Sequence, residues 1–146
     1  MRWFPTFLIL LSLISCAKPS VTRICFIGDS IVARWDLIAS FPNHYTENLA
    51  RSGAGISYLQ EKKGCAKGKI LVVLIGTNDC DSFDDDYAEN YIDAIKQLDA
   101  ELTCVISILP RSYPWDAYSI NTTICGMNQQ IRFLVEQNGW IYLNAY

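Results

Sequence analysis

Three short segments of the chain carry groups that could work together on a carbonyl compound. Ser30 ends a Gly-Asp-Ser tripeptide and offers a hydroxyl nucleophile. The tripeptide Gly53-Ala54-Gly55 offers glycines at which a backbone N–H can approach an oxyanion with no side chain in the way. Asn78 belongs to a Gly-Thr-Asn-Asp tetrapeptide and offers a side-chain N–H to the same oxyanion. Together these residue types predict acyl transfer through a serine, although a Gly-Asp-Ser tripeptide alone also describes an ordinary helix N-cap.

Each of these segments directly follows a predicted strand. The ligand crevice of an open parallel α/β sheet lies outside the carboxyl ends of its strands, so these segments should meet at one edge. The same reasoning predicts that Asp29, Asp79 and Arg111 contact the substrate there, because they also follow strand ends. We expect strands over residues 23–27, 45–50, 70–75, 104–109 and 140–143.

Helical patterns alternate with these strands. The run ILVVLI at residues 70–75 is typical of a strand buried on both faces. Helices are expected over 31–40 and 56–63, then from Tyr87 with an apolar face that reaches Leu102, and finally around residues 124–137 with Asn138-Gly139 as the C-cap. The alternation predicts a three-layer α/β/α fold, with a flavodoxin-like parallel sheet of about five strands.

Residues 24–35 (ICFIGDSIVARW) resemble the first block of the SGNH/GDSL hydrolases, and residues 76–79 resemble their third block. Residues 48–56 look like the second block. The resemblance implies a serine esterase with Ser30 as nucleophile. It also implies an oxyanion hole formed by the N–H groups of Ser30 and Gly55 and the Asn78 side chain. Gly53 is the alternative to Gly55, because the second block is offset from its usual spelling.

The sequence departs from the family in one respect. It contains no Asp-x-x-His, the element that supplies the base in the family, and its single histidine, His44, precedes the second predicted strand. We therefore expect a truncated form that is inactive or weakly active, because serine is a poor nucleophile without a positioned base. We also expect Ile24 and Phe26 to be partly exposed, since a C-terminal helix that covers the sheet in the family would be missing.

The implied substrates are small acyl or acetyl esters, including esters of glycans. A non-catalytic envelope protein that binds a ligand or glycan in the same crevice is the alternative. A nucleotide-binding domain resting on Gly53-Ala54-Gly55 is disfavoured, because the third glycine is missing and the strand is the wrong one. The net charge of -3 also argues against nucleic acid as a partner.

The N-terminal residues resemble an export signal. Arg2 precedes an apolar run over residues 3–14, which is too short to span a bilayer as a helix. The following Ser15-Cys16 resembles the lipobox of bacterial lipoproteins, and an ordinary signal peptide is the alternative. We expect residues 1–15 to be the signal peptide, residues 16–22 a tether with lipidated Cys16, and residues 23–146 the hydrolase domain. The lipid would anchor the chain in the bacterial cell envelope.

No cofactor or metal is expected. The six cysteines lack the close double spacing of a zinc site, and Cys65 with Cys80 is the most plausible bridge among them. The acidic run at residues 84–86 is explained by the start of a helix, where carboxylates are favoured.

Overall fold

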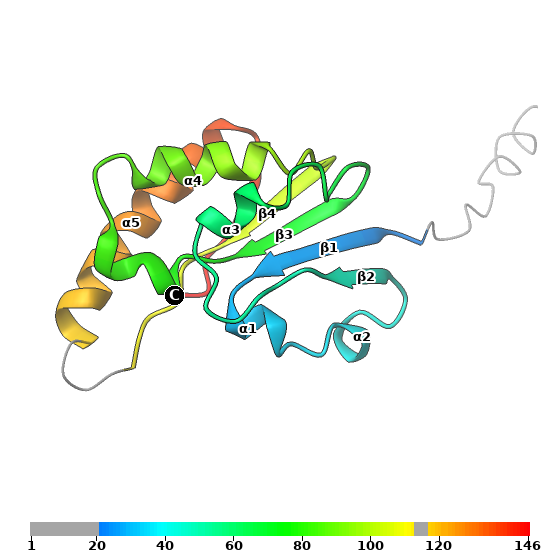
Figure 1. Cartoon of the computed structure of the whole chain (residues 1–146), viewed down its shortest axis with the longest axis horizontal. Coiled ribbons are helices and arrows are strands. Elements are labelled where there is room, and N and C mark those ends of the chain that lie inside the picture. Colours follow the sequence, from blue (N-terminus) through cyan, green and yellow to red (C-terminus); the bar gives the residue numbers. More distant parts are fainter. Residues whose placement is uncertain (1–20, 113–116) are drawn as a thin grey trace, which may run out of the picture.

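The computed structural model of the chain describes residues 21–112 and 117–146 (Figure 1). The predicted signal peptide and the lipidation of Cys16 lie outside the described residues. Within those residues, no helix is long and apolar enough to cross a membrane.

The described chain forms one sheet of five parallel strands in the order β2-β1-β3-β4-β5. This is the order of flavodoxin-like doubly wound sheets, whose strand order reverses between β1 and β3. The predicted three-layer α/β/α class is confirmed. The strands are β1 (Arg23–Gly28), β2 (Tyr45–Asn48), β3 (Ile70–Leu74), β4 (Leu102–Ile106) and β5 (Ile141–Leu143).

Helices cover the two faces of the sheet unequally, as Figure 1 shows. The larger core cluster packs under α3 (Ser57–Gln60), α4 (Tyr87–Lys96) and α5 (Ala117–Gln137). A smaller cluster lies on the opposite face, under α1 (Ser30–Ala33) and α2 (Leu37–Ser40). A 3₁₀ helix, η1 (Thr77–Ser82), follows β3.

The predicted helices have different bounds in the structure. The helix expected over residues 56–63 is shortened to α3, and α5 begins at Ala117, before residue 124. The helix expected over residues 31–40 is divided into α1 and α2, because the Asp36 carboxylate accepts a hydrogen bond from the Ala39 N–H (3.0 Å) and starts a new helix. The helix that begins at Tyr87 ends at Lys96, so Leu102 belongs to β4. The predicted C-cap of α5 is confirmed, because Gly139 has a φ of 69° and its N–H bonds to the Glu136 carbonyl.

The expected exposure of Ile24 and Phe26 is wrong. Both are buried, and the rings of Trp35 and Phe41 lie 5.6 and 5.2 Å from that of Phe26. The chain that links β1 to β2 therefore covers this part of the sheet itself. On the same face, three strand residues at the β4–β5 end are exposed: Leu102 (39% exposed), Ile141 (45%) and Leu143 (49%).

Candidate active site

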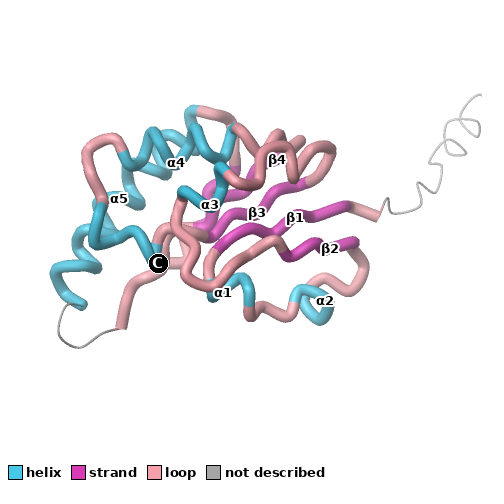
Figure 2. The backbone as a smooth tube through the Cα atoms, in the orientation of Figure 1, coloured by secondary structure: helices cyan, strands magenta, loops and turns pink. Residues whose placement is uncertain are grey.

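Ser30 lies where the sheet reverses its strand order. It is the first residue of α1, directly after β1, and its side chain is partly exposed. The η1 segment follows β3, the strand on the other side of the switch point. In sheets of this topology, a crevice for ligands opens at that point. Figure 2 shows the loops that leave β1, β2 and β3 meeting at this edge.

Asp29, which was predicted to contact substrate, is buried beneath this edge. It is 1% exposed, and its carboxylate accepts a hydrogen bond from the Ile31 N–H (2.9 Å) as the N-cap of α1. Its own N–H bonds to the Leu74 carbonyl (3.3 Å) and so extends the pairing of β1 with β3. Asp29 thus fixes the turn from which Ser30 projects.

The carboxyl of Asp29 should make stability depend on pH. Burial is the main reason that its pKa is raised in the folded chain. The folded state then holds the proton more tightly than the unfolded chain, whose aspartate pKa is about 3.9. The free energy of unfolding should therefore fall as pH rises from that value through the higher native pKa.

Urea unfolding of the wild type and of Asp29→Asn between pH 3 and pH 7 measures this effect. Asparagine keeps the capping oxygen and does not titrate. The free energy of unfolding of the variant should therefore decrease less with rising pH than that of the wild type. Asp36→Asn, at the exposed cap of α2, is the matched control for replacing a capping carboxylate by an amide. An unchanged slope in Asp29→Asn would contradict the prediction.

The loop after β2 is fixed beside the Ser30 turn by an extension of the sheet. The Leu49 N–H bonds to the Phe26 carbonyl (2.8 Å), and the Arg51 N–H bonds to the Gly28 carbonyl (3.0 Å). Parallel pairing therefore continues past the end of β2. The Asn48 side chain adds a bond from its Nδ2 to the Val32 carbonyl of α1 (2.9 Å). The segment that leads to Gly55 is thus held against the turn that carries Ser30.

Asp79 connects this loop to η1 and α4. Its Oδ2 accepts hydrogen bonds from the Ile56 N–H and from the Tyr87 hydroxyl, both at 2.9 Å. Its Oδ1 occupies the space that a side chain on Gly55 would need. Burial and the nearby Asp79 charge raise the pKa of Tyr87, so this hydroxyl stays a donor. The Asp79 carboxylate thus holds the glycine loop, and its predicted contact with substrate stays a prediction.

Asn78 ties the same two loops together one residue earlier. Its Nδ2 donates one hydrogen bond to the Ala54 carbonyl (2.9 Å), and an amide nitrogen has a second N–H to offer. Among the described residues, neither the Ser30 N–H nor the Gly55 N–H has an acceptor. These three donors come from the three loops that the hydrogen bonds hold together. The arrangement can stabilise negative charge on a ligand oxygen.

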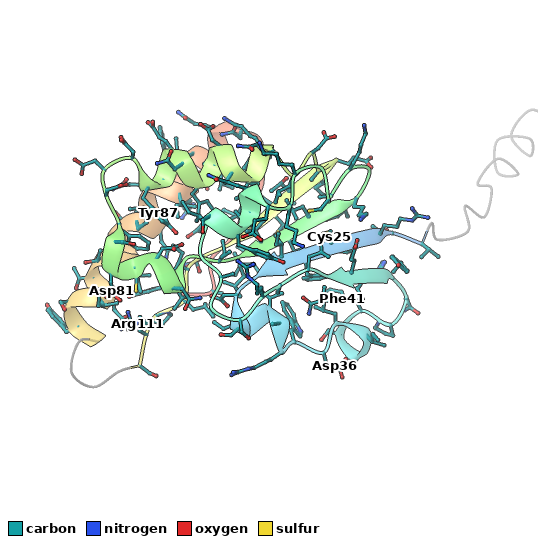
Figure 3. The ribbon with its side chains drawn as sticks, viewed as in Figure 1. Cys25, Asp36, Phe41, Asp81, Tyr87 and Arg111 are labelled. Atoms are coloured by element: carbon teal, nitrogen blue, oxygen red, sulfur yellow. The ribbon has the colours of Figure 1, made fainter. Side chains whose placement is uncertain are left out.

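Arg111 is held by η1 and α5. Its guanidinium donates to Cys80 Sγ (3.0 Å) and to Asp81 Oδ2 (2.9 Å), and Figure 3 shows Arg111 beside Asp81. Its backbone N–H and carbonyl both bond to the side chain of Asn121. The predicted contact of Arg111 with substrate stays a prediction.

Sequence reasoning missed two asparagines of α5. Asn128 accepts a hydrogen bond from the Ile108 N–H and donates one to the Ile108 carbonyl, both at 2.8 Å. Asn121 makes the same pair of bonds with Arg111, at 2.8 and 2.9 Å. Together they fix the segment that follows β4. A spacing of seven residues puts both on one helix face, which is the signal that could have found them.

His44 lies at the opposite end of the strands from Ser30, where β1 and β2 begin. Tyr45, the next residue, pairs with Arg23 at the start of β1, whereas Ser30 follows the end of that strand. At about 3.3 Å per strand residue, the two ends of β1 are about 20 Å apart. His44 therefore does not face Ser30.

Solved structures with the same fold include several ester hydrolases. A member of the lipolytic G-D-S-L family from Veillonella parvula aligns with a TM-score of 0.69 and 17% identity, over 86% of this chain and 79% of its own. A GDSL-like lipase from Bacteroides thetaiotaomicron aligns with a TM-score of 0.63 and 20% identity, over 86% and 69%. An acetyl xylan esterase from Geobacillus stearothermophilus gives 0.65 and 13%, over 83% and 75%. The chain has the three-layer α/β/α fold of these GDSL proteins, so the resemblance expected from its motifs is confirmed at the level of the fold. No family model and no curated protein matches the chain.

Proposed function

We propose that this chain is a serine ester hydrolase of the SGNH/GDSL type, acting on small acyl or acetyl esters. The observation that carries the proposal is the set of hydrogen bonds by which Asn78 and Asp79 hold the Gly55 loop beside Ser30. A nucleophile with unpaired N–H donors next to it is the arrangement that acyl transfer requires. The fold shared with lipolytic proteins and an acetyl xylan esterase supports the ester class.

The chemistry assigned to the site is an acyl-enzyme mechanism. The Ser30 hydroxyl oxygen attacks the ester carbonyl carbon as a base removes its proton. The oxyanion that forms accepts hydrogen bonds from the Ser30 N–H, the Gly55 N–H and the Asn78 amide. The alcohol leaves with a proton, and water then releases the acid from Ser30 by the same path. Gly55 is preferred to Gly53, because Asp79 packs on Gly55 and nothing lies within 4 Å of a Cβ placed on Gly53.

We assign acetylated glycans as the substrate class and the cell envelope as the location. The first assignment rests on the acetyl xylan esterase among the proteins of similar fold. The second rests on the export signal and on Cys16 as the lipidated residue, as predicted from the sequence.

The proposed function is tested by adding a general base to the solution. The site holds a serine and oxyanion donors, and His44 is too far away to act, so free imidazole should increase hydrolysis of para-nitrophenyl acetate above the rate with imidazole alone. Ser30→Ala should abolish this excess rate. Asn78→Ala should lower it by about 100-fold or more, the usual effect of losing one oxyanion donor. Ser40→Ala, in α2, is the matched control and should keep the wild-type excess.

Equal excess rates in the wild type and Ser30→Ala would refute the nucleophile assignment. The second candidate function is that of a non-catalytic envelope protein that binds a glycan in the same crevice. The position of His44 at the opposite end of the strands favours this candidate. It predicts no excess rate with imidazole, and binding of acetylated oligosaccharide that Ser30→Ala leaves unchanged.

A further inference from the structure

Cys25, in β1, lies close to Cys65, which belongs to the turn that joins α3 to β3. Cys25 is fully buried in the middle of β1, where it pairs in register with Glu47 and Leu71 (Figure 3). Cys65 is half-buried and packs against the core cluster that contains Cys25. Lys69 bonds to both the Cys65 carbonyl and Glu47, the register partner of Cys25, so the two cysteines lie close together, and both thiols are free.

The bridge expected between Cys65 and Cys80 is not present. Cys80 lies in η1, where its sulfur accepts a hydrogen bond from the Arg111 guanidinium. The thiol next to Cys65 is instead that of Cys25, in β1.

The turn that carries Cys65 is held in place on both sides. The Gly64 N–H bonds to the Gln97 carbonyl (2.9 Å), and the Ala66 N–H bonds to the Leu98 carbonyl (3.0 Å). Both acceptors directly follow α4. Because these bonds flank Cys65, the backbone holds its thiol against β1.

Charges around the pair distinguish the two thiols. The hydrogen bond from Cys25 and the nearby Lys69 lower the pKa of Cys65, against opposing effects of burial and Glu47. The same hydrogen bond and burial raise the pKa of Cys25. The Lys69 ammonium bonds to the Cys65 carbonyl (2.9 Å) and to the Glu47 carboxylate. Cys65 is thus the thiol that ionises first, with the Cys25 S–H as its donor.

We propose that Cys65 and Cys25 form a disulfide-exchange site that takes low-molecular-weight disulfides such as oxidised glutathione. The Cys65 thiolate attacks one sulfur of the external disulfide, a Cys65 mixed disulfide forms, and one thiolate leaves and takes a proton from water. Cys25 then attacks the Cys65 sulfur and expels the second thiolate, which takes up, through water, the proton that Cys25 loses. Two electrons pass from the cysteine pair to the external disulfide, which becomes two thiols.

Accessibility sets the order of these steps. Cys25 has no exposed surface, so an external disulfide reaches it only through Cys65. The product joins the middle of β1 to the turn before β3. A bond that closes a loop of roughly 40 residues should raise the melting temperature of a domain of this size by about 10 °C.

The experiment treats the full, reduced chain with oxidised glutathione and digests it with trypsin under non-reducing conditions. The expected product joins peptide 24–34, which contains Cys25, to peptide 64–67, which contains Cys65. This product should melt about 10 °C higher than the reduced chain. In denaturant the preference for this pair should disappear, because the fold brings the two thiols together.

Two variants separate the roles of the cysteines. Cys25→Ser should stop the reaction at a stable glutathione adduct on Cys65. Cys65→Ser should leave Cys25 unmodified in the folded chain, and Cys104→Ser is the control that keeps the bond. A bond that maps to another pair, or a Cys65→Ser chain that takes glutathione on Cys25, would overturn the proposal. The result does not depend on the proposed esterase, because no step measures ester hydrolysis.

Discussion

Replacing Gly55 by alanine is expected to lower the free energy of unfolding by about 1–3 kcal/mol. The new Cβ would overlap Asp79 Oδ1. The carboxylate cannot turn away without cost, because its other oxygen accepts hydrogen bonds from the Ile56 N–H and the Tyr87 hydroxyl. Urea unfolding measures the loss. The excess esterase rate with imidazole should fall with it, because the clash displaces the Gly55 N–H.

A double-mutant cycle identifies the clash as the cause. In an Asp79→Ala background, the space beside Gly55 is free, so Gly55→Ala should cost much less than in the wild type. Gly126→Ala is the matched control. Gly126 lies in α5 with nothing within 4 Å of an added Cβ, so alanine there should raise stability by about 0.5–1 kcal/mol. An equal cost of Gly55→Ala in both backgrounds would rule out the clash.

Replacing Asn128 by alanine is expected to lower the free energy of unfolding by about 2–4 kcal/mol. Asn128 is buried and pairs with both backbone groups of Ile108. Its loss leaves a buried N–H and a buried carbonyl without partners, and each costs about 1–3 kcal/mol. Chemical denaturation monitored by circular dichroism measures the change.

Two further variants test whether hydrogen bonding is the reason. Asn128→Leu restores the side-chain volume but not the bonds, so it should remain strongly destabilised. Asn121→Ala removes the equivalent bonds to Arg111 at a partly exposed position, where water can replace them, and should cost about 1 kcal/mol. A fully stable Asn128→Leu would show that packing alone matters at this position.

Local patterns were sufficient to predict the sheet and the positions of the candidate catalytic residues along it. The run around Val73 is apolar on both faces because helices cover both sides, and such a run is recognisable without tertiary information. Ser30 and Asn78 were predicted because each follows a strand, and all parallel strands end at the same edge. Gly55 was predicted from the family resemblance, and the catalytic roles of all three stay predictions. The C-cap of α5 was also predictable, because Asn138-Gly139 is a local signal.

What could not be predicted depends on contacts between distant segments. The hydroxyl of Tyr87 and the N–H of Ile56 decide where the Asp79 carboxylate turns, and the position of Asp79 after a strand does not reveal these partners. Phe26 was expected to be exposed, but Trp35 and Phe41 cover it. No periodicity or spacing in the sequence encodes such partners.

The extended pairing beyond β2 works as a clamp on the chain. The N–H groups of Leu49 and Arg51 bond to β1, so these bonds determine where the segment that leads to Gly55 begins relative to Ser30. The connection between α2 and β2, which includes His44, lies upstream of these bonds. Insertions, deletions and substitutions in that connection should therefore leave the groups that would hold an oxyanion in place.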